Sequence, residues 1–496
     1  MKHFSRNGLL ALALMALAVA PAAAGVYIPT KTADTRDGAC TETDCSLREA
    51  VIAANATAEP DVILLHSGVY VLGLAGAGED AAATGDLDIA DDLTLLGDGV
   101  GTTTVEGAGI DRVFHILAGA SVEIRDVTVA FGAAGAGQDG GGILNAGTLT
   151  LVRTVIAANQ AAGGAGGGLR NQGDSAVLTV RQSLLEGNEA AQGGGIAAQG
   201  TMTLANVTIT NNTASGSGGG IYSYAGLDAT INNATIVLNT ATTQSGGGVF
   251  AESGAFTTVD YPLFTNSIIA ANVAPANRDC SGAATSGGYN VLGVNGDCID
   301  FQAVKGDKVG TSAAPLDARL SPLADNGGPL PTFALLANSP AVNAGNPAAP
   351  GSGGGACEAT DQRGQARTDR CDIGAFERAS AGCVSGTNTL CLNNDRFRVT
   401  ATFTPPQGAG GTARAVEFTS DSGYLTFFDP NNVEVTVKVL NGCGLNNRYW
   451  VFLAGMTNVE VTVTVTDTLT GAVKTYANPQ GRLFRTVADT AAFPCS

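Results

Sequence analysis

Apolar and polar positions recur through the middle of this chain with one inner spacing. In each unit an apolar residue is followed five residues later by a second one, and three residues after that by asparagine. These asparagines are Asn159, Asn188, Asn212, Asn239 and Asn272. Glycine triplets repeat beside them, at 140–142, 166–168, 193–195, 218–220 and 246–248. A period of 25 to 28 residues is typical of stacked structural repeats.

The repeat predicts an all-β fold, a right-handed parallel β-helix. Glycine and β-branched residues interrupt every stretch, so a unit cannot form the helix pair of a helical repeat. Short strands joined by turns would instead form coils that hydrogen-bond to one another at a spacing of about 4.8 Å. Asparagine takes the left-handed backbone conformation at little cost, which predicts a ladder of asparagines at one corner. Glycine would supply a second tight corner.

The two ends of the chain carry different patterns. Residues 25–58 contain Ser46 and Glu49 in a capping box, which predicts a short helix covering the end of the β-helix. We assign residues 59–378 to the β-helix and 379–386 to a linker. In residues 387–496 valines alternate strictly with polar residues, which predicts a small C-terminal β-sandwich. Tyr449, Trp450 and Phe452 would lie in its core or form a sugar-stacking platform.

Several features indicate export. Residues 1–24 form a signal peptide pattern: Lys2 and Arg6, an apolar stretch too short to span a bilayer, and three alanines. Ten cysteines in an oxidising compartment favour disulfide bonds. Close pairs are Cys40 with Cys45, Cys280 with Cys298, and Cys357 with Cys371. The last four, Cys383, Cys391, Cys443 and Cys495, leave three connectivities open.

Charge and acid clusters limit the partners. A net charge of −18 disfavours nucleic acid and anionic membranes. Five aspartates are weak candidates for a calcium site, against the alternative of solvated turns, because calcium prefers clustered oxygen ligands. They are Asp86, Asp88, Asp91, Asp92 and Asp98. We expect no other cofactor, no membrane-spanning segment in the mature chain, and a monomer.

The residues argue against catalysis. A lyase needs a cationic base, and a hydrolase needs two positioned carboxylates. Lysine is absent between Lys31 and Lys305, and the acids of the regular coils do not recur at one position. We interpret His66 and His115 as turn or core residues. Three arginines of the coils are interpreted as isolated solvated side chains: Arg153, Arg170 and Arg181.

Motifs near the ends of the repeat resemble known families. Residues 45–50, Cys-Ser-Leu-Arg-Glu-Ala, resemble the signature of the CSLREA-domain family of secreted bacterial β-helix proteins. Residues 325–329, 361–364 and 372–377 resemble the ending of the choice-of-anchor Q family. The glycine units resemble, more weakly, polymorphic outer-membrane protein repeats, and the tail resembles an uncharacterised β-domain of secreted bacterial proteins. The resemblance implies a pectate-lyase-like β-helix exported by a bacterium, with no known reaction.

Two functions are compatible with these patterns. The first is a secreted or cell-surface scaffold for adhesion or glycan binding, whose partner is a polysaccharide or a cell-envelope component. Stacked asparagines would then contact a polymer, although they would equally satisfy backbone groups at the corners, which is the interpretation we favour. The alternative is a polysaccharide lyase or another polysaccharide-active enzyme, because this fold hosts both classes.

Overall fold

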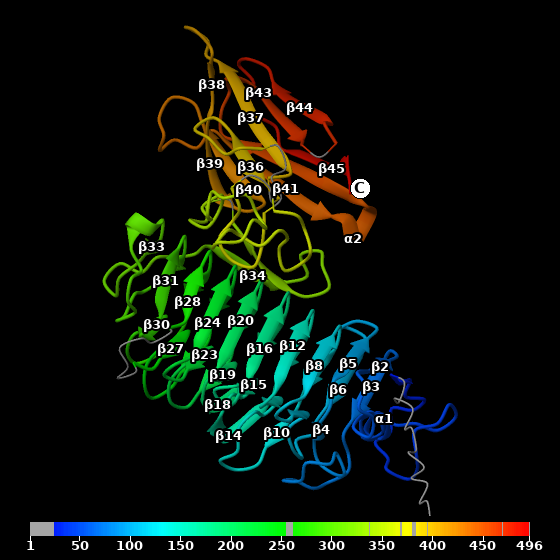
Figure 1. Ribbon diagram of the computed structural model, residues 1–496. Coiled ribbons are helices and arrows are strands. Elements are labelled where there is room, and N and C mark those ends of the chain that lie inside the picture. The colour runs from blue at the N-terminus through cyan, green and yellow to red at the C-terminus, as the bar shows by residue number, and fades with distance from the viewer. Residues whose placement is uncertain are drawn as a thin grey trace, which may run out of the picture.

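The computed structural model describes residues 24–253, 261–336, 338–367, 370–378, 383–393, 395–468 and 470–495. The expected signal peptide, apart from residue 24, lies outside these residues. The described chain is almost entirely β-structure. Figure 1 shows parallel coils stacked from the N-terminal end, in blue, to the green coils, with an antiparallel domain in orange and red beyond them. The predicted all-β fold, a parallel β-solenoid followed by antiparallel sheets, is confirmed.

Four parallel sheets form the solenoid. The first sheet contains β1 (Val26–Tyr27), β2 (Asp61–Leu65), β5 (Leu93–Gly97), β8 (Ser121–Arg125), β12 (Thr148–Val152), β16 (Val177–Arg181), β20 (Thr201–Ala205), β24 (Asp228–Asn232), β28 (Leu263–Thr265) and β31 (Thr285–Gly288). The second contains β3 (Gly68–Val71), β6 (Thr103–Glu106), β9 (Thr128–Ala130), β13 (Val155–Ala157), β17 (Leu184–Glu186), β21 (Thr208–Thr210), β25 (Thr235–Val237), β29 (Ile268–Ala270), β32 (Val291–Leu292) and β33 (Lys308–Val309).

The other two sheets have shorter strands. The third contains β4 (Leu87–Ile89), β7 (Phe114–Ile116), β11 (Ile143–Asn145), β15 (Leu169–Asn171), β19 (Ile196–Ala198), β23 (Ile221–Ser223), β27 (Val249–Ala251) and β30 (Cys280–Gly282). The fourth contains β10 (Ala133–Ala134), β14 (Gln160–Ala165), β18 (Glu189–Gln192), β22 (Thr213–Ala214) and β26 (Thr240–Ala241).

The repeated apolar positions form stacked rows inside the coils. Strand register places the first apolar residue of each unit directly beside that of the next, and every member of the row is fully buried. This row is Leu151, Val180, Leu204, Ile231 and Phe264. Burial of such side chains stabilises the fold by about 1.5–3 kcal/mol each before the entropic cost of ordering them. The row therefore holds successive coils in one register.

The repeated asparagines form a column of buried side chains. From Asn188 onward, the Oδ1 atom of each accepts hydrogen bonds from both the backbone N–H and the side-chain amide of the asparagine one coil earlier, at 2.8–3.1 Å. The column ends at Asp279, whose Oδ1 accepts the same two bonds from Asn272 at 2.8 and 3.0 Å. The column therefore satisfies backbone and amide donors that have no access to water.

The prediction that these asparagines take the left-handed backbone conformation is wrong. The left-handed residue is the one before the asparagine, as at Ala158, Asn211 and Leu238, with φ of 54°, 55° and 60°. Turning the chain one residue earlier directs the asparagine side chain inward. There the Nδ2 of Asn212 reaches the carbonyl of Leu185, one coil earlier, at 3.0 Å.

The glycine triplets form a second tight corner. Gly193 has a φ of 60°, which favours glycine. At Gly194 an added Cβ would lie 2.5 Å from the carbonyl oxygen of Thr213 in the next coil. Larger side chains are therefore excluded by the backbone of the neighbouring coil.

The N-terminal end is covered by α1 (Leu47–Ala54). Ser46 and Glu49 form the predicted capping box. Arg48 is completely buried, pairs with Asp34 at 2.7 Å, and donates hydrogen bonds to the carbonyls of Ala82, Gly85 and Asp86. The arginine of the 45–50 motif thus fastens the cap to the loop before β4.

The C-terminal coils are closed by irregular chain. It includes η1 (Ala303–Lys305) and the hairpin of β34 (Leu320–Ala324) and β35 (Thr332–Leu335). We call residues 355–367 the strap, because they run back along the solenoid towards its N-terminal end. The strap carbonyls at Gly355, Ala356, Thr360 and Asp361 accept hydrogen bonds from side chains of four successive coils. The donors are Asn266, Asn232, Asn206 and Gln182.

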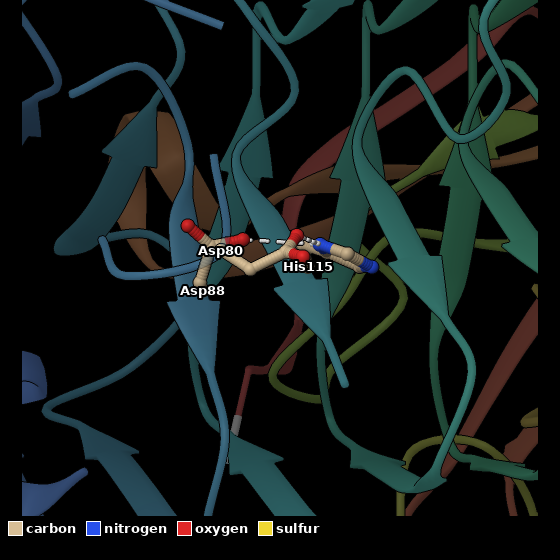
Figure 2. Close-up of side chains that lie close together, drawn as sticks. All are labelled: Asp80, Asp88 and His115. Atoms are coloured by element: carbon tan, nitrogen blue, oxygen red, sulfur yellow. Dashed lines mark hydrogen bonds and ion pairs between the residues drawn. The ribbon is translucent and has the colours of Figure 1, made fainter. Parts of the chain in front are cut away.

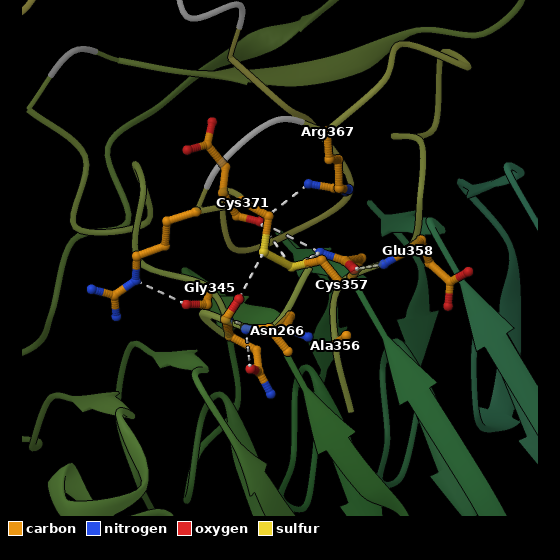
Figure 3. The surroundings of a disulfide bond; sticks show 12 residues. Asn266, Gly345, Ala356, Cys357, Glu358, Arg367 and Cys371 are labelled. Atoms are coloured by element: carbon orange, nitrogen blue, oxygen red, sulfur yellow. Dashed lines mark hydrogen bonds between the residues drawn. A yellow bond between two sulfur atoms is a disulfide. The ribbon is translucent and has the colours of Figure 1, made fainter. Parts of the chain in front are cut away.

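Buried charges fasten the strap. Arg367 is fully buried, and its guanidinium donates to Glu377 at 2.9 Å, to Asn206 at 3.0 Å and to the carbonyl of Gly374 at 2.8 Å. Burial raises the pKa of Glu377, and the Asp372 carboxylate adds to this shift. The Cys357–Cys371 disulfide lies beside this network (Figure 3). Residues 361–367 and 370–377 therefore close the solenoid with buried charges that pair with one another.

Two antiparallel sheets form the C-terminal part. One contains β36 (Leu390–Leu392), β37 (Phe397–Thr404), β38 (Gly411–Thr412), β43 (Glu460–Asp467) and β44 (Val473–Asn478). The other contains β39 (Arg414–Thr419), β40 (Ser422–Thr426), β41 (Val435–Gly442), β42 (Arg448–Gly455) and β45 (Val487–Pro494), with α2 (Cys443–Asn446) after β41.

These sheets pack face to face around one core, which includes Val399, Val437 and Val463. Tyr449 packs against this core, as predicted. The core placement is wrong for Trp450 and Phe452, which are half-buried on the opposite face because side chains alternate along β42. The alternative role of these two side chains, in a sugar-stacking platform, stays a prediction.

The cysteines form five disulfide bonds. The three predicted close pairs are joined, and the last four cysteines pair as Cys383–Cys391 and Cys443–Cys495. The second of these ties α2 to the chain after β45, which closes a loop of the second antiparallel sheet.

An ion pair at the start of the antiparallel part predicts how the stability of the protein depends on pH. Arg378 pairs with Asp395 at 2.9 Å. Burial raises the pKa of Asp395 from 3.8 to about 6, and Arg378 opposes the shift. Because the folded-state pKa is raised, protonated Asp395 favours the folded state. Its contribution to the free energy of unfolding is complete below about pH 4 and is lost as pH rises through 6. Between these values we expect the wild-type protein to lose about 1–2 kcal/mol more stability than Asp395→Asn.

Chemical denaturation at several pH values, followed by the fluorescence of the single tryptophan, Trp450, would measure this difference. Parallel pH profiles for the two proteins would contradict the assignment.

Candidate functional site

One line of side chains runs along the outer surface of the third sheet. Its strands are three residues long, and the middle residue of each faces outward. Register places these middle residues side by side across eight strands. We call this line the outer row: Asp88, His115, Leu144, Arg170, Ala197, Tyr222, Phe250 and Ser281.

Three aromatic side chains gather on the C-terminal half of the outer row. We call Tyr222, Tyr224 and Phe250 the aromatic cluster. The ring of Tyr222 stacks on Phe250 at 5.1 Å and meets the edge of Tyr224 at 4.9 Å. The Arg170 guanidinium lies over the Tyr224 ring, 4.3 Å from its centre. Tyr224 and Phe250 remain partly exposed, so this face offers aromatic surface to a ligand.

Polar groups hold the cluster in place. Arg170 donates to Asp139 at 3.2 Å, and the Tyr222 hydroxyl donates to Glu252. Burial raises the pKa of Tyr222, and the bond to Glu252 raises it further. Arg170 is 5% exposed, so its interpretation as an isolated solvated side chain is wrong. Its pairing with Asp139 comes from the preceding coil, which the sequence pattern did not reveal.

A polar groove lies beside the aromatic cluster. Its volume is about 500 Å³, and residues of five successive coils line it. Glycine backbone forms much of its floor, and the lining side chains include Asp139, Gln192, Ser215, Tyr224 and Gln244. Because coils repeat at about 4.8 Å, the groove runs roughly 20 Å along the solenoid axis.

A second cavity lies under the β34–β35 hairpin. It measures about 600 Å³ and is lined mainly by apolar side chains such as Val237, Leu316 and Phe333. Asp279 in its wall is already engaged as the end of the asparagine column. This cavity suits a small apolar ligand, whereas the groove suits an extended polar one.

The five candidate aspartates for calcium are not gathered into one ligand set among the described residues. Asp86 pairs with Arg112 at 3.0 Å. Asp92 and Asp98 accept backbone N–H groups at 2.8 Å from Ser121 and Ser67 respectively. Asp91 accepts the N–H of Asp92, and Asp88 belongs to a different group, described next.

Two carboxylates face the same imidazole nitrogen of His115 at the N-terminal end of the outer row (Figure 2). This Nδ1 is 3.0 Å from Oδ1 of Asp88 and 3.6 Å from Oδ1 of Asp80. Interpreting His115 as a turn or core residue is therefore wrong. Asp88 and His115 are one coil apart in the sequence, and this spacing is the signal that could have revealed them. His66, by contrast, is largely exposed and 3.9 Å from Asp98.

Another acidic group already holds a lysine. Asp37, Asp44 and Glu49 lie close together near α1, and the Lys31 ammonium forms ion pairs with all three. A metal ion would have to displace this lysine.

Comparisons of the chain with protein-family models, with curated proteins and with solved structures give no match. The fold alone defines the class of protein. It is a parallel β-solenoid, closed by a helix and a strap, with an antiparallel β-domain. Within the described ranges, no helix has the length and apolarity needed to cross a membrane.

Proposed function

We propose that this protein is a secreted or cell-surface scaffold that binds a polysaccharide in the groove and does not cleave it. The observation that carries the proposal is the aromatic cluster beside a polar groove built from successive coils. Partly exposed rings of Tyr224 and Phe250 would stack on sugar rings. Asp139, Gln192 and Gln244 would accept or donate hydrogen bonds to hydroxyl groups.

The charges favour a neutral polymer. Arg170 and Asp139 form an ion pair beside the aromatic cluster, which leaves the negative charge of Glu252 there. The chain as a whole carries a net charge of −18. An acidic polysaccharide would therefore be repelled both locally and by the whole protein.

The bonding of the carboxylates supports binding rather than cleavage. Asp139 accepts bonds from Arg170 and from the backbone N–H of Ala165, and Glu252 accepts bonds from Tyr222 and Ala225. A lyase would need a lysine or arginine side chain free to accept a proton from the sugar, and Arg170 is held by Asp139 and Tyr224. A polysaccharide lyase or related enzyme is the alternative, which the experiment below would detect.

We further propose that the protein is exported by a bacterium. The five disulfides are of the kind that persist in oxidising compartments. The signal peptide pattern and the resemblance to CSLREA-domain and choice-of-anchor Q proteins support the same location. Both motifs also have structural roles here, since Arg48 holds the cap on the loop before β4 and Glu377 pairs with Arg367 of the strap.

Binding to a panel of neutral and acidic polysaccharides would test the function. We expect at least one neutral polymer to bind, and Tyr224→Ala or Phe250→Ala to weaken that binding about tenfold, the loss of one stacking contact. Phe418→Ala is the matched control, because Phe418 is an exposed aromatic side chain of the antiparallel domain. We expect it to bind as the wild type does.

Two results would contradict the proposal. Binding to no polymer, or equal binding by the groove variants and the wild type, would exclude the groove as a glycan site. Release of new chain ends from a bound polymer, with or without calcium, would establish an enzyme instead.

A further inference from the structure

We propose that Asp80, Asp88 and His115 bind a first-row divalent metal ion of the zinc type. Nothing in this proposal depends on the glycan function. One imidazole nitrogen and one oxygen from each carboxylate lie within 4.8 Å of one another. Three ligand atoms with bonds of about 2.0–2.2 Å to one tetrahedral ion lie roughly 3.3–3.6 Å apart, and the Nδ1–Oδ1 distances of 3.0 and 3.6 Å are close to this separation.

The arrangement serves a metal better than a proton. Nδ1 of His115 faces Oδ1 of Asp88 at 3.0 Å and Oδ1 of Asp80 at 3.6 Å. A single N–H on Nδ1 can bond well to one carboxylate only, whereas a cation between the three atoms would contact all of them. An imidazole ligand with two carboxylates suits zinc or a similar ion, and it disfavours calcium and magnesium, which prefer oxygen.

The backbone already fixes two of the three ligands. Asp88 and His115 are directly paired residues of β4 and β7. Asp88 is fully buried, and its Oδ2 accepts the backbone N–H of Ala82 at 2.9 Å, which leaves Oδ1 directed at the imidazole. Support of this kind orients a ligand before the metal binds.

The loop that carries Asp80 is anchored on both sides. The neighbouring carboxylate of Glu79 accepts backbone N–H groups from Ala81, Ala83 and Thr84 at 2.6–2.9 Å. Arg48 of α1 holds the carbonyl of Ala82 at 3.0 Å. The Asp80 side chain itself is 72% exposed, so a metal ion can reach the site from solvent and retain a water molecule.

The local charge favours a cation. The buried carboxylates of Asp34 and Asp86 are paired with Arg48 and Arg112. For Asp88, the ion-pair partner in the part of the chain that the structure describes is His115, with no lysine or arginine. Burial of a carboxylate without a full counter-charge is costly, and a bound divalent ion would remove that cost.

Titration of the untagged protein with zinc chloride, followed by calorimetry and by NMR of ¹⁵N-labelled histidine, tests the proposal. We expect one zinc ion per chain and a shift of the His115 Nδ1 resonance. His115→Gln should weaken zinc binding at least about 100-fold, because loss of supporting groups alone costs 10–100-fold. Asp80→Asn should weaken it about tenfold or more, and its exposed position leaves the fold intact.

His66→Gln is the matched control, since His66 also lies near an aspartate but lacks a third ligand. It should bind zinc as the wild type does. The proposal fails if zinc does not bind stoichiometrically, if Asp80→Asn binds as tightly as the wild type, or if an equal concentration of calcium displaces the zinc. Should His115→Gln not fold, Asp80→Asn and the His115 resonance still decide the question.

Discussion

Replacing Arg367 with methionine is expected to destabilise the solenoid by about 3–5 kcal/mol, the cost of breaking a buried ion pair by removing one partner. Methionine keeps much of the side-chain volume but leaves Glu377 buried without its counter-charge. It also removes the bonds to Asn206 and to the carbonyl of Gly374. Urea unfolding followed by far-UV circular dichroism would measure the loss, because the solenoid supplies most of the strands.

Two further variants control this experiment. Adding Glu377→Gln to Arg367→Met should recover part of the lost stability, because the uncompensated charge is then removed. Arg370→Met should change stability by less than about 0.5 kcal/mol, since Arg370 is exposed. A variant Arg367→Met as stable as the wild type would show that the strap is not held by this ion pair.

Replacing Asn212 with alanine should destabilise the solenoid by about 3 kcal/mol or more. The substitution removes the acceptor of the backbone N–H and the side-chain amide of Asn188. It also removes the donor to the carbonyl of Leu185. Each buried group left without a partner costs about 1–3 kcal/mol. The same urea titration would measure the effect.

The adjacent Asn211 offers a matched control. It is exposed and has a φ of 55°, so glycine fits its backbone without strain. We expect Asn211→Gly to cost less than about 1 kcal/mol. Equal destabilisation by the two substitutions would mean that the corner matters as a turn and that the hydrogen-bonded column does not.

The coil architecture was predictable because one physical requirement repeats in every unit. Buried positions such as Leu151 and Ile156 must be apolar in each coil, and the asparagine after them must reach the coil before, so the sequence carries a visible period. The left-handed residue was misplaced by one position, because a turn tolerates Ala158 and Leu238 there as well as asparagine. The pattern of residue types therefore locates the corner but not its backbone conformation.

The outer row was not predictable in the same way. Its members include an acid, a histidine, an arginine and two aromatic residues, because the neighbours that cover this outward face differ from coil to coil. Variable turns between coils also hide the register that brings Asp88 beside His115. The calcium prediction failed for the opposite reason. Asp91 and Asp98 are close in sequence, but side chains alternate between the two faces of the strand that joins them, and the chain then turns a corner.

The contacts of the closing segment could not be predicted from its own sequence. Nothing local in residues 361–377 indicates that Arg367 contacts Asn206, which lies 161 residues earlier in the chain. Such a contact depends on how many coils separate the two partners. The sequence shows the repeat, but it does not show that a later segment returns along it.

The strap also bears on how this protein could change in length. Its carbonyls accept hydrogen bonds from four successive coils, at roughly two strap residues per coil. All four bonds can form only if the number and spacing of these coils match the strap. Duplication or loss of a coil between Gln182 and Asn266 would move the donors on one side of the change away from their strap carbonyls. The coils before Gln182 carry no such constraint from these contacts. Natural variation in repeat number should therefore concentrate in the N-terminal half of the solenoid.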